Sequence, residues 1–209
     1  MAENLAGQLH LMLVTDDLLL DGRDPVEVCL AAQRGGATCV QLRLKFVRPR
    51  DLLRQAHRLR AALSIPIIVN DRADVAIAAA SGVHLGPGDI PADLVRLIAP
   101  KEMIVGCSVG STSEVEGGRR ADYWGIGPWR LTRTKPDAGA ALGAEGFRAL
   151  AQASGGRPCV AIGGVTPEDV GPARRAGAAG VAVISGILGR TDIEEATREY
   201  AKAWEEASR

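Results

Sequence analysis

Hydroxyl and cationic side chains gather in one short stretch of the chain, "LTRTKPD" at residues 131–137. Thr132 and Thr134 flank an arginine, and Lys135 follows directly. Threonine, proline and aspartate are ordinary turn residues, so a solvated turn would explain the stretch by itself. The alternative is an anion site, in which hydroxyl groups and a cation bind a phosphate. Polar residues elsewhere in the chain must decide between the two.

A second group of polar side chains lies at the end of the apolar stretch at residues 38–44. Gln41, Arg43 and Lys45 are spaced by two, so in an extended strand their side chains point to the same side. A half-exposed strand would show the same alternation of polar and apolar residues. If that side is the interior of a barrel, however, the two cations need an anion to offset the cost of burying them.

Carboxylates follow the next two apolar stretches. Asn70 and Asp71 end "PIIVND", and Asp89 comes shortly after "GVHLG". Each aspartate could be only a helix cap, and Asp93 could cap the second helix instead of Asp89. Alternatively, the two can share Mg²⁺, because this ion takes one or two carboxylates together with substrate phosphate oxygens and water. His84 stands alone within its strand, and we interpret it as a packed core residue.

Small residues end three later apolar stretches. Ser108 ends "MIVGCS", Gly163 and Gly164 end "PCVAIGG", and Ser185 with Gly186 ends "GVAVISG". Glycines before a helix let backbone N–H groups approach an oxyanion closely, and the helix N-terminus adds a favourable partial charge. A glycine pair is weak evidence for a phosphate site by itself, so its position in the fold matters.

The elements that would hold these residues alternate along the chain. Apolar, β-branched runs without clean polar alternation are typical of strands covered on both faces. They predict eight strands, at residues 9–16, 38–44, 66–71, 82–86, 103–108, 122–128, 158–164 and 180–186. Helical spacing predicts eight helices, at residues 24–36, 48–63, 72–81, 91–99, 111–121, 144–153, 166–177 and 192–207. Asp24-Pro25 and Thr166-Pro167 mark two helix starts, each with a capping side chain before a proline.

Eight strands alternating with eight helices in 209 residues predict an α/β protein, a (β/α)₈ TIM barrel with a single domain over residues 1–209. An open doubly wound sheet is the alternative, which periodicity does not exclude. One connection, at about residues 128–141, is longer than the others and contains "LTRTKPD". In a barrel it would be an active-site loop, because the loops after the strands form the active site.

Barrel geometry brings the strand ends together into two anion sites. One would hold a metal-bridged group between Arg43, Lys45, Asp71 and Asp89. The other would bind a phosphate on the glycine-containing loops after strands seven and eight, where barrels often have phosphate sites. The segment "TRTK" would lie between them. Cations and a magnesium ion around a leaving pyrophosphate stabilise the charge that develops, which is typical of a transferase.

Composition excludes several other classes of function. The chain has 25 basic and 25 acidic residues and 3% aromatic residues, so neither its charge nor a base-stacking surface favours binding to nucleic acid or an anionic membrane. Four dispersed cysteines without a CxxC pair predict buried free thiols in a reducing compartment. The acidic N-terminal segment and the short apolar runs predict neither a signal peptide nor a membrane span. We therefore expect a soluble cytoplasmic protein, for which a homodimer is compatible with the sequence.

Seven of these stretches together resemble the thiamine-phosphate synthase (thiamine-phosphate pyrophosphorylase) family of small (β/α)₈ enzymes. They occur in the order and at the separations typical of that family: "VQLRLK", "IIVNDRADVAIAAASGVHLGPGD", "GCS", "ADYWGIGP", "TRTKPD", "AIGGVTPEDV" and "AGAAGVAVISGI". The resemblance extends from "LMLVTDD" to about residue 187. Each motif is moderately specific, but seven in register leave little room for coincidence.

The resemblance implies an enzyme that joins 4-amino-2-methyl-5-hydroxymethylpyrimidine diphosphate to 4-methyl-5-(2-phosphooxyethyl)thiazole, releasing pyrophosphate and forming thiamine phosphate. It implies a dissociative, Mg²⁺-assisted substitution. Carried over by motif, the residues that contact the pyrimidine diphosphate are Gln41, Arg43, Lys45, Asn70, Ser108 and Lys135, of which Arg43, Ser108 and Lys135 would be catalytic. Asp71 and Asp89 would bind Mg²⁺. The residues that bind the thiazole phosphate would be Thr132, Thr134, Gly164, Ile184 and Ser185.

The chain departs from the family pattern at a few positions, none of which carries an assigned role. Leu44, Pro87 and Gly110 stand where the family often has Glu, Gln and His, and residues 129–131 read Trp-Arg-Leu where it usually reads like Ile-Phe-Pro. A related thiazole tautomerase uses a histidine at the position of Gly110, so that alternative is disfavoured. A non-catalytic barrel that binds a thiamine precursor is a further alternative, because a retained pocket does not prove turnover.

Overall fold

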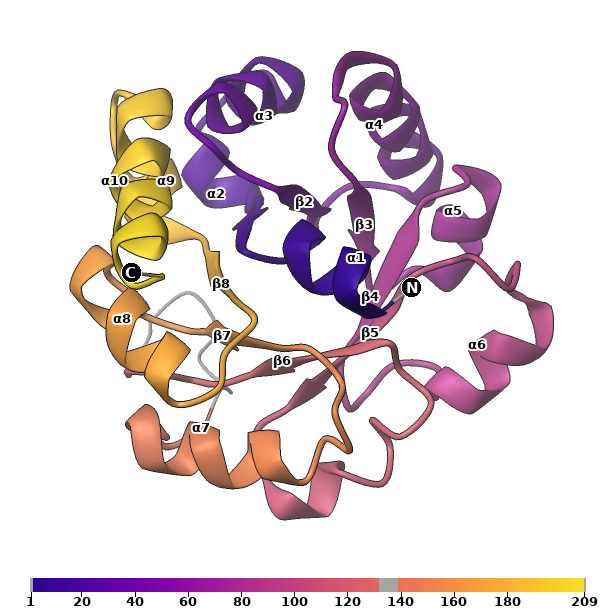
Figure 1. Cartoon of the computed structure of the whole chain (residues 1–209). Helices are drawn as coiled ribbons and strands as arrows, with labels where there is room; N and C mark the ends of the chain where they lie inside the picture. The colour runs from indigo at the N-terminus through magenta and orange to yellow at the C-terminus, as the bar shows by residue number, and fades with distance from the viewer. Residues whose placement is uncertain (1, 132–138, 209) are drawn as a thin grey trace.

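Eight parallel strands close into a barrel in chain order, and the computed structural model describes residues 2–131 and 139–208 (Figure 1). Each strand pairs with its sequence neighbours, and the last pairs with the first through Leu11 and Val181. The prediction of a (β/α)₈ barrel is therefore confirmed, and the open doubly wound sheet is excluded. The strands are β1 Leu11–Val14, β2 Cys39–Leu42, β3 Ile67–Asn70, β4 Gly82–Leu85, β5 Val105–Val109, β6 Tyr123–Ile126, β7 Cys159–Ile162 and β8 Gly180–Val183.

The helices surround the barrel, and Figure 1 shows α1 lying across the end that faces the viewer. Asp24 caps α3 by accepting a hydrogen bond from the Val26 N–H at 2.9 Å, as the Asp24-Pro25 pair predicts. The α-helices are α1 Ala2–Gln8, α2 Asp17–Leu20, α3 Pro25–Arg34, α4 Pro49–Ala62, α5 Ala73–Ala78, α6 Ala92–Ile98, α7 Gly143–Gln152, α8 Pro167–Arg175, α9 Ser185–Leu188 and α10 Ile193–Glu206.

The prediction of a helix at residues 111–121 is wrong. The structure has a short 3₁₀ helix, η1 at Thr112–Glu114, followed by turns. The buried indole of Trp124 packs against Gly118 and donates a hydrogen bond to its carbonyl oxygen at 2.8 Å. A Cβ atom on Gly118 would lie 2.5 Å from Trp124 Nε1, so the chain must turn closely around this side chain. This hydrogen bond from a buried tryptophan to a backbone carbonyl is a tertiary contact, and the helical spacing of apolar residues does not reveal it.

The core has two layers, which explains why the strands lack polar alternation. One layer fills the barrel interior and includes Met12, Cys39, Tyr123 and Val160, while the other lies between the sheet and the helices. Tyr123 fits inside because Gly106 on the neighbouring strand has no side chain: a Cβ atom there would lie 2.2 Å from the tyrosine ring. Because both faces of the strands are buried, most strand residues are apolar.

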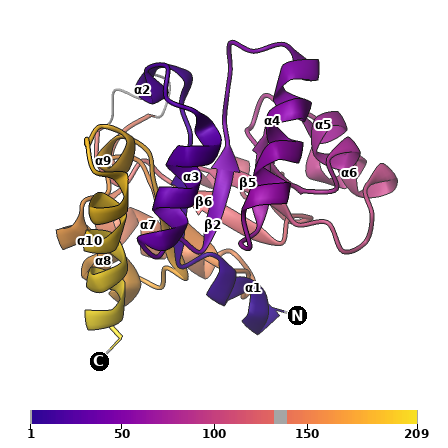
Figure 2. The ribbon, with the colours of Figure 1, turned by 90° about the horizontal axis from the view of Figure 1, so that it is seen from above.

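The two ends of the barrel differ, as Figure 2 shows: α1 lies at one end, and α2 and α9 lie at the other. Helices α2 and α9 directly follow β1 and β8, so they mark the end at which the strands finish. The four cysteines are buried and free, as predicted, and burial raises the pKa of the Cys29 thiol to about 12.

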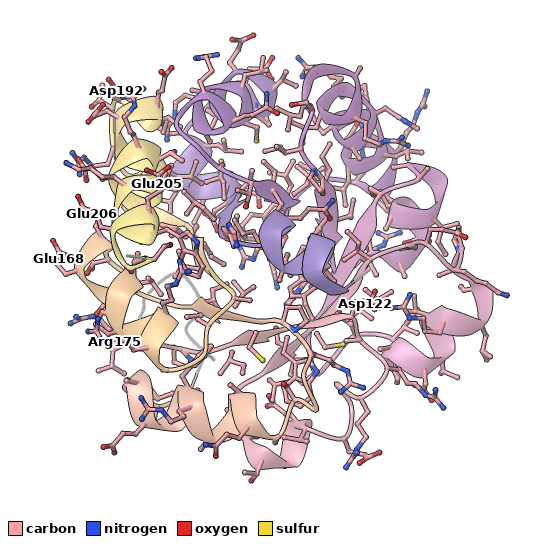
Figure 3. All side chains as sticks on the ribbon, viewed as in Figure 1. Asp122, Glu168, Arg175, Asp192, Glu205 and Glu206 are labelled. Atoms are coloured by element: carbon pink, nitrogen blue, oxygen red, sulfur yellow. The ribbon has the colours of Figure 1, made fainter. Side chains whose placement is uncertain are left out.

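Charged side chains project from the outer surface, where the exposed Glu168, Arg175, Asp192, Glu205 and Glu206 are labelled in Figure 3. Within residues 2–131 and 139–208, no helix has both the length and the apolar character that crossing a membrane requires.

Candidate active site

A cavity of about 400 Å³ opens at the end of the barrel where the strands finish, a size typical of sites for small molecules. It is lined by residues that follow seven of the eight strands and by Val14 of β1. Thr132, Thr134 and Lys135 lie outside the described residues. The other site residues expected from the sequence all line this cavity: Gln41, Arg43, Lys45, Asn70, Asp71, Asp89, Ser108, Gly164, Ile184 and Ser185.

Arg43 is held at the cavity wall by the end of the first strand. Its Nη1 donates to Asp16 Oδ2 at 2.6 Å, and the two side chains are only 14% and 12% exposed. The Arg43 N–H also donates to the Thr15 hydroxyl at 2.8 Å. Sequence reasoning missed Asp16, although it follows its strand just as Asp71 does. The ion pair orients the guanidinium, so Arg43 can present its remaining donors to an anion without reorganising.

Two carboxylates, Asp71 and Asp89, face each other across the cavity entrance. Burial and the nearby negative charge of Asp71 raise the pKa of the Asp89 carboxyl, although a hydrogen bond from the Gly86 N–H opposes this rise. That N–H lies 2.6 Å from Asp89 Oδ2, and Lys45 Nζ lies 3.5 Å from Asp71 Oδ2. Two adjacent carboxylates that repel each other form a donor set that suits a hard divalent cation.

Neither carboxylate caps the helix that follows it. The N-cap residue of α5 is Arg72 and that of α6 is Pro91, and neither helix has a side-chain cap. Asp71 itself adopts a left-handed backbone conformation with φ +65°, which is uncommon for a residue other than glycine. The capping alternative is therefore wrong for both aspartates. Their side chains instead contact Lys45 and the Gly86 N–H and line the cavity.

A hydrogen-bonded chain runs from the barrel interior to the cavity through His84. Tyr123 Oη lies 2.9 Å from His84 Nδ1, and Ser108 Oγ lies 3.0 Å from His84 Nε2. Burial raises the pKa of the Tyr123 phenol well above its usual value, so this group stays neutral. His84 is buried, as predicted, but it also orients the Ser108 hydroxyl, which sequence reasoning missed because Ser108 is 24 residues away.

The glycine loop after β7 is fastened by a buried carboxylate. Gly163 and Gly164 have φ of +93° and +68°, and the following helix begins at Pro167. Asp169 Oδ2 accepts hydrogen bonds from the N–H and the hydroxyl of Thr166, both at 3.0 Å. Arg130 donates to both Asp169 oxygens, at 2.7 and 2.6 Å. This cluster joins the loop after β6 to the start of α8.

The Asp169 carboxylate predicts how stability depends on pH. Burial would raise its pKa, but hydrogen bonds from Arg130, Thr166 and Trp129 outweigh burial and lower it to about 2. A lowered pKa stabilises the fold above the unfolded-state value and loses that effect as the pH falls through 2. We therefore expect Asp169→Asn to reduce the free energy of unfolding by about 2 kcal/mol at pH 7. Denaturant titrations should show this difference in unfolding free energy shrinking between about pH 4 and pH 2. A difference that does not change with pH would contradict the lowered pKa of Asp169.

One departure from the expected pattern, Gly110, lines the cavity, and another, Trp129, directly follows the lining residue Pro128. The Gly110 N–H donates to Glu114 Oε2 at 2.6 Å, and both residues line the cavity. A carboxylate from η1 therefore lies beside the position where the resemblance predicts a histidine. Trp129 is buried and packs edge-on against Phe147 of α7, with ring centroids 5.9 Å apart. The chain thus anchors the start of the long loop with an aromatic pair.

Known proteins similar to this chain agree in one family. A family model described as thiamine monophosphate synthase matches residues 11–187. A thiamine-phosphate synthase of Xanthobacter autotrophicus is 46% identical over 202 residues, which cover 93% of this chain and 95% of the relative. One of Syntrophomonas wolfei is 40% identical over 201 residues, covering 93% and 96%. The solved structure of a thiamine phosphate pyrophosphorylase from Pyrococcus furiosus superposes with a TM-score of 0.87, at 36% identity, over 98% of this chain and 99% of that one.

Proposed function

The chain belongs to the thiamine-phosphate synthase family, and from this membership we infer that it is a transferase with thiamine-phosphate synthase activity. The reaction that we propose joins the pyrimidine diphosphate to the thiazole phosphate and releases pyrophosphate. The observation that carries this proposal is the cavity lining, in which Arg43, Lys45, two carboxylates and a glycine loop occur together and Lys45 contacts one of the carboxylates. Such a lining suits a substrate with a diphosphate and a second substrate with a phosphate.

The pyrimidine diphosphate would bind to side chains at the ends of β2 and β3 and in the loop that follows β2. We assign Gln41, Arg43, Lys45 and Asn70 to this substrate, together with Lys135 of the long loop. Support comes from the fixed position of Arg43, whose guanidinium can donate hydrogen bonds to phosphate oxygens in a planar fork. The buried Gln41 lies deeper in the barrel, where it would contact the ring rather than the diphosphate.

A magnesium ion would be held by Asp71 and Asp89. Their donor set fits this ion, because Mg²⁺ takes one or two carboxylates and completes its shell with water and phosphate oxygens. When bound, Mg²⁺ would supply positive charge to the diphosphate and so favour its departure. Lys45 contacts Asp71 at 3.5 Å and would add a second cation to the same region.

The chemistry that we propose is dissociative. Pyrophosphate leaves first, a pyrimidinylmethyl cation forms, and the thiazole nitrogen captures it. No covalent nucleophile is needed, so the tasks of the protein are positioning, exclusion of water and stabilisation of the leaving group. Ser108 would contact the pyrimidine and the leaving group, with its hydroxyl oriented by His84. Lys135 would stabilise the charge that develops on the leaving pyrophosphate.

The thiazole phosphate would bind at the loops after strands six to eight. We assign Thr132, Thr134, Gly164, Ile184 and Ser185 to it. Ile184 precedes α9, and the first N–H groups of a helix lack intrahelical acceptors, so they can bind a phosphate together with the glycine loop. A cytoplasmic location belongs to the same proposal as an expectation from the sequence, with which a homodimer is also compatible.

One assay tests the function directly. We expect purified protein with both substrates and Mg²⁺ to form thiamine phosphate and pyrophosphate in equal amounts, detected by chromatography and a coupled pyrophosphate assay. Chelation of Mg²⁺ should lower the rate strongly, and its re-addition should restore it. Binding of both substrates without either product, with or without Mg²⁺, would instead support a non-catalytic barrel that binds a thiamine precursor.

A further inference from the structure

The ion pair between Arg130 and Asp169 lies at the edge of the cavity without lining it. The Arg130 side chain is 58% exposed, whereas that of Asp169 is 6% exposed and is also bonded to Thr166. Two parallel hydrogen bonds between a guanidinium and a carboxylate fix orientation as well as distance. The pair therefore holds Arg130 at one position relative to the start of α8.

The backbone of Arg130 in turn holds the glycine loop. Its N–H donates to the Gly163 carbonyl oxygen at 2.8 Å, and a Cβ atom on Gly164 would lie 2.9 Å from Arg130 Cβ. Both glycines have positive φ, and a glycine restrains its own backbone less than any other residue does. Their conformation must therefore be set by what packs against them, which is Pro128 for Gly163 and Arg130 for Gly164.

The segment before Arg130 is itself restrained by α7. The Leu142 N–H donates to the Pro128 carbonyl oxygen at 2.8 Å, and the Gly143 N–H donates to the Trp129 carbonyl oxygen at 3.1 Å. The Trp129 ring also packs on α7, as described above. Residues 128–130 are thus held by α7 on one side and by Asp169 of α8 on the other. Because they pack against the glycine loop, they restrain its position as well.

We propose that the Arg130–Asp169 pair is a positioning device for the phosphate of the thiazole substrate. By holding Arg130 against Gly163 and Gly164, it keeps the loop N–H groups in the conformation that receives this phosphate. The inference rests on the proposed function, because it takes the glycine loop as the phosphate site. Neither side chain is a catalytic residue, since both act through the loop and not on the substrate.

Arg130→Gln removes the ion pair, while the N–H and hydroxyl of Thr166 still donate hydrogen bonds to the buried Asp169. We expect a less stable protein that still folds, and thermal unfolding checks this before kinetics. The substitution should raise both KM and Kd for the thiazole phosphate by about 10-fold, because a misplaced binding loop loses its fit to the ligand. KM for the pyrimidine diphosphate should change less than about 2-fold, since that substrate binds on the opposite strands. Arg130→Lys should give an intermediate value, because lysine keeps the charge but not the two-pronged geometry. Kd is measured by calorimetry with the thiazole phosphate, and KM by steady-state assay.

A matched control is Arg34→Gln, which removes an ion pair between α3 and α10 away from the cavity. Arg34 is also 58% exposed, and its Nε lies 2.8 Å from Glu194 Oε2. This variant should keep both KM values. Unchanged affinity for the thiazole phosphate in Arg130→Gln, or an equal loss for both substrates, overturns the positioning role. Absence of turnover in the wild-type protein would instead refute the proposed function, and the calorimetric comparison would still decide the role of the pair.

Discussion

Asp71→Asn is expected to lower kcat/KM by about 10²-fold or more, because it removes one of the two charges that would hold the proposed metal beside the diphosphate. The Mg²⁺ concentration for half-maximal rate should rise by about 10-fold or more. The substitution should change the backbone at this position very little. Asp71 has φ +65°, a conformation in which asparagine is well tolerated, and its N–H donates to the His84 carbonyl oxygen at 2.8 Å in either case. The fold should therefore survive while the metal site weakens.

The chain offers a matched control for this substitution. Asp21 also has a left-handed backbone, with φ +47°, but it is exposed at the end of α2 and does not line the cavity. Asp21→Asn should leave both kcat/KM and the Mg²⁺ requirement unchanged. Rates are measured over a Mg²⁺ titration at fixed substrate, and folding is checked by thermal unfolding. An Asp71→Asn protein that folds and keeps the wild-type Mg²⁺ dependence would remove Asp71 from the metal site.

Local rules predicted which charged side chains after β2, β3 and β4 line the cavity. The continuous apolar runs identified the strands, because both faces of the sheet are buried. The spacing of Gln41, Arg43 and Lys45 predicted that they lie on one side, and all three line the cavity, although β2 ends at Leu42 and only Gln41 belongs to it. Asp71 and Asp89 were expected to meet because neighbouring strands end at the same edge of a barrel. These inferences depend on strand geometry alone, which is why a single sequence carries them.

Contacts between loops were not predictable in the same way. Asp16 pairs with Arg43 only because the loops after β1 and β2 approach each other, and Arg130 meets Asp169 across 39 residues of chain. In neither pair does a sequence motif or a residue spacing predict which residue the other one contacts. Turns around Trp124 likewise replaced the helix expected at residues 111–121. The sequence therefore did not reveal the contacts between loops that orient the cavity residues.

Arg43→Gln is the second substitution with a large expected effect. Removing the guanidinium should lower kcat by about 10²- to 10³-fold, because a preorganised donor to the leaving group is lost. KM for the thiazole phosphate should stay near the wild-type value. The change also strands the carboxylate of Asp16, whose side chain is 12% exposed, and loss of a partner from a buried pair costs about 3 kcal/mol of unfolding free energy. Low activity in the single variant could therefore reflect instability rather than lost catalysis.

A double variant separates these two effects. Asp16→Asn removes the stranded charge but can still cap α2, because asparagine accepts hydrogen bonds from the Leu18 and Leu19 N–H groups as aspartate does. Combined with Arg43→Gln, it should recover most of the lost stability in denaturant titrations while kcat stays low. Arg48→Gln is the control, since it breaks an ion pair with Asp51 in which the Arg48 side chain is 85% exposed, and both properties should be unchanged. If kcat recovers together with stability in the double variant, Arg43 serves the fold alone and another cation must stabilise the leaving pyrophosphate.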